Sequence, residues 1–547
     1  MSHSVSGESG GEREQPPPAG AGLRPAGVAP YPLGRLRELL PLGAVPDDAD
    51  LEVTGITHNS RQVVAGDLFA ALPGAATHGA RFVEAALDAG AAAIFTDEDG
   101  ASVAGEAASR AGVPVVVVDH PRAWLGEIAA AVYGHPAKDL MMLGVTGTNG
   151  KTTTSYLIEA GLRQAGLVVG LMGTVQTRIG ATVMPSVRTT PEATDVHATL
   201  AVMREHGASA CVMEVSSHAL AFGRVDGIRF DVAGFTNLSQ DHLDFHAGME
   251  DYFAVKTRLF TSRRSARAVV CVDDEYGRRL AAQIDLPGAT VAAAGWQRGA
   301  TTTAPAHDEP ARDPRVRWRV EPGEPVRLAG TDGRVVDLQV PLPGDFNVAN
   351  TALAVAMLVE AGIDAEVAAA GVGGCPGVPG RMERVHVDDP EAPMMVVDYA
   401  HTPDAIENVL LALRTPRPGH QPGMLVAVTG AGGDRDRDKR PLMGAAAARH
   451  ADVLVITDDN PRQESPEAIR AAVRAGAGRL DTGGDVVEVA DRRGAIRAAL
   501  DRVRGPDDIV VVLGKGHEPG QEIAGTVYPF DDRVVLREEY LGKMGKR

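Results

Sequence analysis

The sequence predicts an α/β protein of three domains, the first of them smaller than the other two. Its 547 residues exceed what one hydrophobic core usually organises, so we expect the chain to divide. Along most of it, short apolar runs alternate with amphipathic helical stretches, a pattern typical of parallel sheets covered by helices. A glycine-rich loop, L-G-V-T-G-T-N-G-K-T-T-T at residues 143–154, joins one such run to a helix and predicts phosphate binding in the middle domain.

The overall composition excludes several classes of protein. A net charge of −18 disfavours nonspecific nucleic-acid binding, which needs basic surfaces. Three cysteines, Cys211, Cys271 and Cys375, lack the C-x-x-C spacing of thiolate metal sites and fit a reducing compartment. No apolar run has the length of a membrane span, and the N-terminus has no signal-peptide pattern. We therefore expect a cytoplasmic protein, a monomer, without nucleic-acid or membrane partners.

The N-terminal part of the chain predicts a tail and then a small α/β domain. Residues 1–30 are mainly Ser, Gly, Glu and Pro, which predicts a disordered tail. The small domain spans residues 31–138, and its expected segments are Leu36–Leu40, Val53–Thr57, Asp67–Ala71, a helix at Ala80–Ala89, and strands at Ala92–Thr96 and Val115–Val118. Three motifs place polar side chains at loop positions beside its strands: N-S-R at 59–61, G-D-L-F at 66–69 and T-H-G at 77–79. They suit an anionic ligand, but equally turns and helix caps.

The central domain, residues 139–376, begins with the glycine-rich loop. An apolar strand at Leu140–Val145 leads into it, and a helix at Thr152–Gln164 follows. Lys151 is placed to reach the β- and γ-phosphates of a nucleotide, and the Thr152 hydroxyl to hold a magnesium ion. The strict P-loop pattern has glycine where this chain has Val145. The remaining pattern, G-K-T-T after a strand, still indicates nucleotide phosphate binding.

Polar motifs also follow two further strands of the central domain. Ala208–Val215 ends in E-V-S-S-H, residues 214–218, and Asp231–Thr236 is followed by N-L-S-Q-D-H-L-D-F-H, residues 237–246. Because ligands of parallel α/β sheets bind at the carboxyl ends of strands, both motifs are expected to face the same crevice as the P-loop. Glu214 is placed to hold magnesium and His242 lies nearby, although either could be a buried polar residue with a structural role.

Two helices carry further candidate residues. A helix at Met249–Phe260 presents Lys256 on a largely apolar face, where a lysine usually extends its ammonium to water. After an expected surface insertion at Arg298–Arg315, L-P-G-D-F-N-V-A-N opens a long helix at residues 342–350. Asn347 and Asn350 share one face of that helix, and could bind a base or phosphate or cap the helix.

A Gly/Pro-rich stretch near Cys375 predicts the boundary of a C-terminal doubly wound domain, residues 377–547. Its expected strands are Met394–Val397, Leu425–Thr429, Val453–Thr457, Val486–Val489 and Ile509–Leu513, and its expected helices are Pro403–Leu413, Arg440–Arg449, Pro466–Ala475 and Arg493–Val503. G-A-G-G at residues 430–433 imitates a dinucleotide fingerprint. That signal is weak, because the charged run D-R-D-R-D-K-R follows it where an apolar helix should begin.

Taken in order, these motifs resemble those of the Mur ligases of peptidoglycan synthesis, from residue 31 to the C-terminus. The matching motifs are N-S-R, G-D-L-F, T-G-T-N-G-K-T, T-T-P at 189–191, E-V-S-S-H, N-L-S-Q-D-H-L-D-F-H, V-K-T-R-L-F at 255–260, G-D-F-N at 344–347, G-R-M-E at 380–383, D-Y-A-H-T-P at 398–403, G-G-D-R-D, D-N-P-R at 459–462 and G-K-G-H-E at 514–518. The resemblance implies a UDP-substrate domain, a central ATPase domain and a C-terminal Rossmann-like domain that binds an amino acid. It also implies ATP-dependent addition of 2,6-diaminopimelate to UDP-N-acetylmuramoyl-L-alanyl-D-glutamate through an acyl phosphate, with Mg²⁺.

The resemblance also implies roles for individual residues. The catalytic residues would be Lys151, Glu214, His242 and Lys256, the last carbamylated, and the metal-binding residues Thr152, Glu214, His242 and Lys256. The ATP-binding residues would be Gly147, Thr148, Asn149, Gly150, Lys151, Thr152, Thr153, Asn347, Arg381 and Asp398. The residues for the UDP-muramoyl dipeptide would be Ser60, Thr189, Thr190, Ser216 and Arg224. Those for diaminopimelate would be Arg435, Asp459, Asn460, Pro461, Arg462, Gly514 and Glu518.

Arg462 carries the expectation about the amino acid. Diaminopimelate has one carboxylate more than lysine, and an arginine fork is suited to hold it; relatives that add lysine lack this arginine. One departure from the family is Phe222, where some relatives have glutamine. Two alternatives remain: folylpolyglutamate synthesis, whose enzymes lack the N-terminal motifs, and a nucleotide-gated regulatory protein, which would not need Lys151, Glu214, His242 and Lys256 together.

Overall fold

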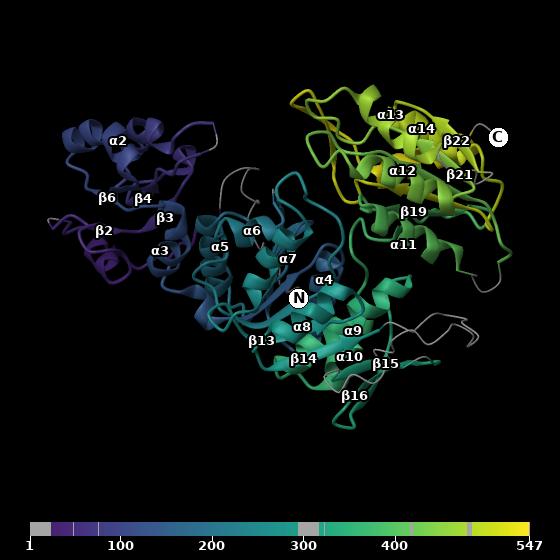
Figure 1. The fold of residues 1–547 in the computed structure, drawn as a ribbon, viewed down its shortest axis with the longest axis horizontal. Coiled ribbons are helices and arrows are strands. Elements are labelled where there is room, and N and C mark those ends of the chain that lie inside the picture. Colours follow the sequence, from purple (N-terminus) through teal and green to yellow (C-terminus); the bar gives the residue numbers. More distant parts are fainter. Residues whose placement is uncertain are drawn as a thin grey trace, which may run out of the picture.

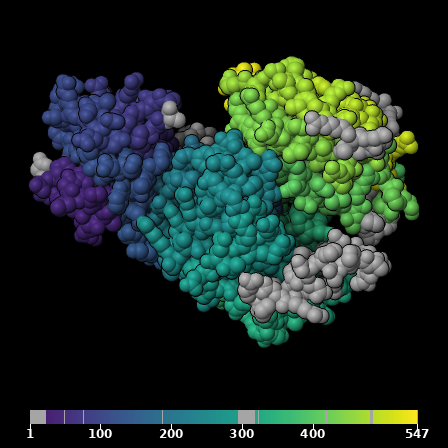
Figure 2. Space-filling view, viewed as in Figure 1, coloured from purple at the N-terminus to yellow at the C-terminus, as the bar shows by residue number. Residues whose placement is uncertain are grey.

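The computed structural model describes residues 23–545 except 48, 75, 187, 294–316, 322, 416–419 and 479–483. The expected insertion at Arg298–Arg315 lies outside the described residues. The N-terminal and C-terminal parts lie on opposite sides of the central part, so that the three form a V with the central part at its base (Figure 1). The space-filling view shows the C-terminal part in contact with the central part and separated from the N-terminal part by a notch (Figure 2).

The N-terminal part is built on a four-stranded parallel sheet in the order β3-β4-β5-β6. Its strands are β1 (Tyr31–Pro32), β2 (Glu52–Val53), β3 (Gly55–Thr57), β4 (Asp67–Ala70), β5 (Ala93–Thr96) and β6 (Val115–Val117), with β1 and β2 paired separately. Its helices are η1 (Leu33–Glu38), η2 (Ser60–Gln62), η3 (Gly79–Phe82), α1 (Val83–Asp88), α2 (Glu98–Ala111), η4 (Pro121–Ala123), α3 (Leu125–Val132) and η5 (Pro136–Asp139). The expected strand Val53–Thr57 is thus divided at Thr54 between two sheets.

The central part has an eleven-stranded sheet in the order β10-β9-β8-β11-β7-β12-β13-β14-β15-β16-β17. Its strands are β7 (Met141–Thr146), β8 (Val169–Met172), β9 (Gln176–Ile179), β10 (Thr182–Pro185), β11 (Ala210–Glu214), β12 (Phe230–Phe235), β13 (Ser265–Cys271), β14 (Gly288–Ala292), β15 (Trp318–Glu321), β16 (Val326–Gly330) and β17 (Val335–Leu338). Its helices are α4 (Lys151–Gln164), α5 (Ala193–Glu205), α6 (Ser217–Ala221), α7 (Met249–Thr257), η6 (Arg258–Phe260), α8 (Glu275–Gln283), α9 (Asp345–Glu360) and α10 (Ala365–Gly373).

The middle strands of this sheet determine where the site lies. β11, β7 and β12 are parallel neighbours, and Glu214 and Phe235 stand in register with Val145 and Thr146 at the end of β7. The loops that follow all three strands therefore open at one edge, which confirms the prediction that both polar motifs face the P-loop crevice. Two apolar cores, one on each face of the sheet, pack against these strands.

The C-terminal part has a six-stranded sheet in the order β18-β19-β23-β20-β21-β22, parallel except for β18. Its strands are β18 (Glu383–Arg384), β19 (Met394–Asp398), β20 (Leu425–Thr429), β21 (Val453–Ile456), β22 (Asp485–Glu488) and β23 (Ile509–Leu513), followed by a separate hairpin of β24 (Gly520–Ile523) and β25 (Thr526–Pro529). Its helices are α11 (Pro403–Arg414), α12 (Lys439–His450), α13 (Pro466–Ala477), α14 (Arg492–Leu500) and α15 (Asp532–Met544). The Rossmann-like expectation is confirmed, and the hairpin and α15 are additions to it.

The predicted tail, residues 1–30, needs a correction at its C-terminal end. Residues 1–22 lie outside the described part of the chain. The Arg24 guanidinium pairs with the buried Asp67 carboxylate at 2.7 Å, and the amides of Ala26 and Gly27 donate to Glu205 at 3.0 and 2.7 Å. Residues 23–30 are therefore packed against both the first and the central domain. Their low hydrophobicity misled the prediction, because ionic and backbone contacts hold them.

Candidate active site

The P-loop adopts a conformation that only glycine allows at two positions. Gly147 and Gly150 have φ angles of +146° and +87°, in the region that favours glycine. A Cβ atom would lie 1.8 Å from Thr236 Oγ1 at Gly147 and 2.4 Å from Asn350 Oδ1 at Gly150. The loop is thus tightly enclosed by side chains from the loop after β12 and from α9.

Hydrogen bonds from the N-L-S motif keep the P-loop in place. Asn237 Oδ1 accepts from the Asn149 amide at 3.0 Å and its Nδ2 donates to the Asn149 carbonyl at 3.2 Å. Thr236 Oγ1 donates to the same carbonyl at 2.6 Å. Asn237 begins the motif noted in the sequence and Thr236 precedes it, but their role was missed because their partner Asn149 lies more than 80 residues away.

Lys151 lies at the start of α4 with its ammonium turned onto the loop. Its Nζ donates to the carbonyls of Gly147 and Thr148 at 3.0 and 2.8 Å. Burial lowers the pKa of Lys151, and the negative charges of Glu214 and Asp241 oppose that shift. A phosphate entering the loop would supply the counter-charge that this buried ammonium lacks.

Thr152 and Glu214 form the oxygen-rich part of the site. Thr152 Oγ1 donates to Glu214 Oε2 at 3.0 Å, and Thr174 donates to the same carboxylate from its amide at 2.7 Å and its hydroxyl at 2.9 Å. Thr174 Oγ1 also contacts Thr189 Oγ1 at 3.0 Å. A buried carboxylate beside hydroxyls is a suitable donor set for a hard cation.

Lys256 does not extend to water, as most lysines on such a face would. Only 1% of its surface is exposed; its Nζ donates to the Gly147 carbonyl at 2.9 Å and lies 4.6 Å from the centre of the Tyr252 ring. Burial, and then repulsion from Lys151, hold the pKa of Lys256 well below its usual value. The ammonium of Lys256 is therefore enclosed beside the P-loop and does not reach solvent.

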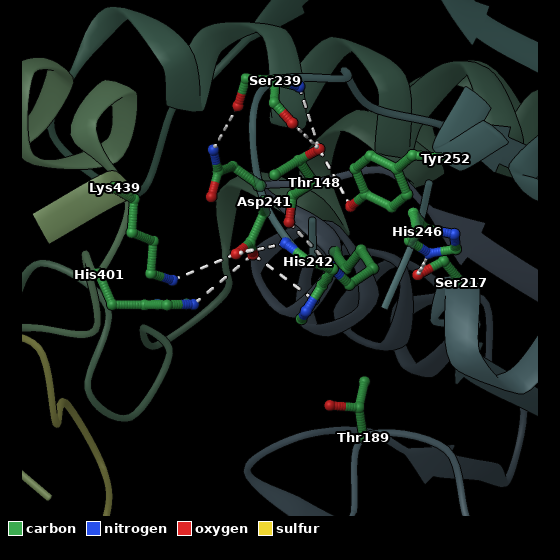
Figure 3. Close-up of polar contacts among 12 residues, drawn as sticks. Thr148, Thr189, Ser217, Ser239, Asp241, His242, His246, Tyr252, His401 and Lys439 are labelled. Carbon is green, nitrogen blue, oxygen red and sulfur yellow. Dashed lines mark hydrogen bonds and ion pairs between the residues drawn. The ribbon is translucent and has the colours of Figure 1, made fainter. Parts of the chain in front are cut away.

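Asp241, which the sequence reasoning did not single out, lies between the central and C-terminal domains. Figure 3 shows its carboxylate between His242 on one side and Lys439 and His401 on the other. The Nζ of Lys439 is 3.2 Å away, and the Nε2 atoms of His242 and His401 are 3.5 and 3.9 Å away. Burial raises the pKa of Asp241, but these neighbours outweigh burial and hold it below its usual range.

His242 is partly buried beside Asp241. Burial lowers its pKa to about 3, against the attraction of Asp241, and its backbone φ of +56° lies in the left-handed region. Its ring also packs edge-on against His218, with centroids 4.9 Å apart. Of the predicted metal set, Thr152 and Glu214 are in direct contact, whereas His242 faces Asp241 and Lys256 contacts the Gly147 carbonyl.

A cavity of about 610 Å³ joins the P-loop to residues of the C-terminal domain. Arg381 reaches across to Thr152, with Nη2 3.1 Å from Oγ1, and lies 4.2 Å over the Tyr399 ring. Asp398 accepts from the amides of Met382 and Ala400 at 2.6 and 2.7 Å. Burial raises the pKa of Asp398, which Arg381 opposes.

Asn347 and Asn350 lie on the same face of α9 and line this cavity. Asn350 Nδ2 donates to Asn347 Oδ1 at 3.0 Å, and Asn347 Nδ2 donates to the Pro343 carbonyl at 2.7 Å. This confirms the predicted shared face. Phe346 and Ala405 add apolar walls, so the cavity has the mixed character of a nucleotide site.

A second polar group extends from the central domain toward the N-terminal domain. Thr190 Oγ1 donates to the Glu214 carbonyl at 2.8 Å. The same Oγ1 contacts the Ser216 hydroxyl and accepts from the Ser216 amide. Arg224 Nη1 donates to the Thr190 carbonyl at 3.3 Å. Ser60 lies apart from them, in η2 of the first domain, where Asn59 caps the turn.

Three arginines converge on one buried carboxylate beside this group. Glu192 pairs with Arg224 at 2.8 Å, with Arg122 at 3.2 Å, and with Arg188. One carboxylate cannot neutralise three guanidinium groups, so the cluster keeps positive charge for an anion. Phe222, at the position of the noted departure, packs between Arg122 and Arg224, with cation-to-ring distances of 5.8 and 5.6 Å.

In the C-terminal domain the D-N-P-R loop follows β21. Arg462 has a left-handed φ of +53° and pairs as a β-bridge with Ile523 of the β24–β25 hairpin. Its Nη1 donates to the Gly433 carbonyl at 2.7 Å and its Nε lies 3.4 Å from Glu522 Oε2. The guanidinium is thus held in place but remains partly accessible.

The G-A-G-G sequence has a packing role against this loop. A Cβ at Gly433 would lie 1.9 Å from the Pro461 carbonyl oxygen, and one at Gly430 would lie 2.4 Å from that of Thr457. The Gly433 amide donates to the Asn460 carbonyl at 2.9 Å. These glycines allow the D-N-P-R backbone to approach, which accounts for the weak match to a dinucleotide fingerprint.

Most of the other residues expected to bind the amino acid surround the D-N-P-R loop. Asn460 Nδ2 donates to Glu518 Oε2 at 2.8 Å, and the Asp459 carboxylate faces Gly514. Burial raises the pKa of Glu518, and the negative charge of Asp459 raises it further. Arg435 is the exception. Its guanidinium donates to the Asp434 carbonyl at 2.8 Å and is exposed, so no direct contact joins it to the loop.

Comparison with known proteins gives matches over most of the chain. The family model described as "Mur ligase family, catalytic domain" matches residues 52–133, "Mur ligase middle domain" matches residues 145–358, and "Mur ligase, glutamate ligase domain" matches residues 380–516. In the part of the chain that the structure describes, no helix has the length and hydrophobicity to cross a membrane.

Individual relatives are similar over nearly their full lengths. UDP-N-acetylmuramoyl-L-alanyl-D-glutamate–2,6-diaminopimelate ligase of Streptomyces coelicolor is 51% identical over 94% of this chain and 97% of its own. UDP-N-acetylmuramyl-tripeptide synthetase of Leifsonia xyli is 44% identical over 95% of this chain and 99% of its own. A solved structure of UDP-N-acetylmuramoyl-L-alanyl-D-glutamate–2,6-diaminopimelate ligase superposes with a TM-score of 0.60 at 30% identity, covering 94% of this chain and all of that one.

Proposed function

The chain belongs to the Mur ligase family, and from this premise we infer that it is the ATP-dependent ligase that joins 2,6-diaminopimelate to UDP-N-acetylmuramoyl-L-alanyl-D-glutamate. The reaction builds a peptidoglycan precursor in the cytoplasm. The observation that carries the assignment is the D-N-P-R loop, which presents Arg462 as a fixed and partly accessible guanidinium.

ATP would bind in the cavity between the central and C-terminal domains. The P-loop amides of residues 147–153 and the Lys151 ammonium suit its phosphates. Asn347 of α9 and Arg381 and Asp398 of the C-terminal domain line the same cavity. Because Arg381 contacts Thr152 directly, nucleotide binding is coupled to the position of the C-terminal domain.

Magnesium is the metal that the donor set favours. Among the described residues, no three His, Cys, Asp or Glu side chains are grouped closely enough to hold a metal. Mg²⁺ usually takes one or two carboxylates and completes its shell with phosphate oxygens and water, so Glu214, Thr152 and the nucleotide fit it. When bound, magnesium neutralises phosphate charge and so permits one anion to approach another.

Lys256 would act as a carbamate, with His242 beside it. The neutral amine attacks CO₂, so that an Nζ–C bond forms and one proton leaves. The product is an anion, and its nitrogen keeps one N–H, which can still donate to the Gly147 carbonyl at the observed position. The carbamate of Lys256 would offer oxygen ligands to a metal ion in addition to those of Glu214. An ammonium at the same place would repel the metal ion.

The UDP-muramoyl dipeptide would extend from the first domain into the central domain. Ser60 lies in the first domain, and Thr189, Thr190, Ser216 and Arg224 lie at the end next to Glu214. Arg122 and Arg188 add positive charge for the anionic parts of this substrate. Phe222 supplies an apolar surface where some relatives have glutamine.

Two chemical steps follow from this arrangement. The γ-carboxylate of D-glutamate attacks the γ-phosphorus of ATP, so that an O–P bond forms, the bond to the β-phosphate oxygen breaks, and ADP leaves. The neutral amine of diaminopimelate then attacks the acyl carbon, the C–O bond to phosphate breaks, and the amine loses a proton. Lys151 stabilises the charge of the transferred phosphoryl group, and Arg462, Asn460 and Glu518 hold the far end of the amino acid.

Phosphate release from ATP tests this function. With both UDP-muramoyl dipeptide and diaminopimelate present, release should follow the rate of tripeptide formation, and omission of either should reduce it to background. A folylpolyglutamate synthase would instead respond to a folate and glutamate, and a regulatory ATPase would release phosphate without either substrate. Either of those results would contradict the proposed ligase function.

A further inference from the structure

A fully buried ammonium lies behind the D-N-P-R loop. Lys515, in the G-K-G-H-E segment after β23, has 0% of its surface exposed. Its Nζ donates to Asn460 Oδ1 and to Glu518 Oε2, each at 3.3 Å, and to the Gly520 carbonyl. All three donors of the ammonium are thus used. Lysine is almost never buried to this extent unless it is paired.

Lys515 determines which way the Asn460 amide faces. Asn460 Oδ1 accepts from the Lys515 ammonium and from the Glu522 amide at 2.9 Å. With two donors at one end, the Nδ2 end must face the other way, where it donates to Glu518 Oε2 at 2.8 Å. Rotating the amide by 180° would place its NH₂ group against an ammonium and its oxygen against a carboxylate, which is strongly unfavourable.

The same ammonium fixes the carboxylate of Glu518. Both Lys515 Nζ and Asn460 Nδ2 bond to Oε2. The other oxygen, Oε1, accepts no hydrogen bond from any residue in the described part of the chain. The carboxylate is therefore held through one oxygen, and the second stays available to a positively charged ligand.

Through Gly520 the lysine also reaches the strand that holds Arg462. Gly520 begins β24, and two residues later the Glu522 carbonyl accepts from the Arg462 amide at 3.1 Å. The Ala524 amide then donates to the Arg462 carbonyl at 2.7 Å. One buried ammonium thus connects the asparagine, the glutamate and the strand beside the arginine.

We propose that Lys515 is a positioning residue for amino-acid selection: it orients Asn460 and Glu518 so that the second oxygen of Glu518 binds the ammonium at the far end of the incoming amino acid while Arg462 binds its carboxylate. The proposal rests on the proposed function. A substrate with an ammonium and a carboxylate on one carbon needs an acceptor and a guanidinium at a fixed separation. Lys515 keeps that separation without touching the substrate.

Steady-state phosphate release from Lys515→Met tests the proposal. Methionine retains the length of the side chain but has no donor. We expect the KM for diaminopimelate to rise by about 10- to 100-fold, by analogy with the loss of hydrogen-bond partners that orient metal ligands. The KM values for ATP and for UDP-muramoyl dipeptide should stay within about 2-fold, because their sites do not depend on this network.

A double-mutant cycle separates positioning from a general loosening of the domain. In a Glu518→Ala background, Lys515→Met should raise the KM for diaminopimelate by much less than in the wild type, since part of its target is gone. Lys543→Met is the matched control, because Lys543 of α15 donates to the Leu500 carbonyl away from the D-N-P-R loop. It should leave all three KM values unchanged.

Each other outcome contradicts the proposal. An unchanged KM for diaminopimelate in folded Lys515→Met, or equal rises for all three substrates, would show that Lys515 does not position these residues. If Lys515→Met fails to fold, Lys515→Gln replaces it, and if both fail, the lysine serves folding alone. A wild-type enzyme that does not use diaminopimelate would instead refute the proposed function, which keeps the two failures distinct.

Discussion

The D-N-P-R loop takes its partners from one domain, whereas the P-loop site takes its partners from two. Arg462, Asn460 and Glu518 are held by Gly433, Lys515 and the β24–β25 hairpin, all in the C-terminal domain. Around the P-loop, Arg381 and Lys439 reach across from the C-terminal domain to Thr152 and Asp241. The amino-acid site is therefore built in advance, while the phosphoryl-transfer site depends on how the domains meet.

The largest effect is expected at Lys256, in the two-domain site. Lys256→Ala removes the proposed carbamate, and ligation should fall by about 10³-fold, the loss typical of a central electrostatic group. Nucleotide binding should remain, because Lys151 and the P-loop amides are intact. Product formation and calorimetric titration with ATP measure the two effects.

Two observations would decide the carbamate assignment. In ¹³C-bicarbonate, the wild type should show a carbamate ¹³C resonance that Lys256→Ala lacks, and added acetate should restore part of the variant's activity. Full activity of Lys256→Ala without added carboxylate would rule the carbamate out.

A large loss of stability is expected from breaking the buried ion pair behind the D-N-P-R loop in the C-terminal domain. Arg492 and Asp532 have side chains with 0% exposure and pair at 2.7 Å, and Arg492 also donates to the Asp458 and Leu513 carbonyls. Arg492→Met should lower the free energy of unfolding of the C-terminal domain by about 3–5 kcal/mol, because it leaves a buried charge without its partner.

Its neighbour provides the control. Arg493 is 41% exposed and pairs with Glu538 and Glu539 on the surface. Arg493→Met should cost less than about 1 kcal/mol, as surface ion pairs usually do. Equal losses in both variants, measured by urea unfolding, would show that the buried pair has no special role in the domain.

A smaller effect should follow from uncoupling the two domains. Lys439→Met removes the partner of the buried Asp241, and we expect about a 10-fold fall in kcat/KM for ATP. That fall is about 1.4 kcal/mol, within the range for coupled pairs. Asp241→Asn should add little in the Lys439→Met background. Fully multiplicative losses would mean that the two residues act independently.

A comparable effect is expected in the N-terminal segment. Arg24→Ala should lower the free energy of unfolding by about 1–3 kcal/mol, since the buried Asp67 loses a hydrogen-bonded partner. Removal of residues 1–30 should cost at least as much, contrary to what composition predicts. Thermal unfolding of the two variants would measure the loss of stability. An unchanged midpoint in both would contradict the claim that residues 23–30 stabilise the fold.

Features formed by one stretch of sequence could be predicted, whereas those formed by distant residues could not. The P-loop is one unbroken stretch of sequence, and so is the D-N-P-R loop. The order of residues in each stretch therefore predicts a strand, a turn and a helix directly. The pairing of Asp241 with Lys439 spans 198 residues, and no local pattern reports it. The same holds for the burial of Lys256, which depends on the Gly147 carbonyl 109 residues away.

Composition and local sequence did not predict two features that depend on charged contacts between distant residues. Residues 23–30 lack large apolar side chains apart from Leu23 and Val28, yet Arg24 and backbone amides hold them. Arg122 and Arg188 were missed because a lone arginine on a loop gives no signal until Glu192 is placed beside it. In both cases charged contacts between distant residues decided the structure.

The most direct test of the account is the choice of amino acid by wild type and Arg462→Ala, measured as phosphate release with saturating ATP and UDP-muramoyl dipeptide. Loss of the partner of a buried carboxylate costs about 3–5 kcal/mol. Arg462→Ala should therefore lose on the order of 10²- to 10³-fold in kcat/KM for diaminopimelate, while lysine should be a poor substrate of both proteins. If the wild type joins lysine as fast as diaminopimelate, or if Arg462→Ala keeps the preference, the assignment of this site is wrong.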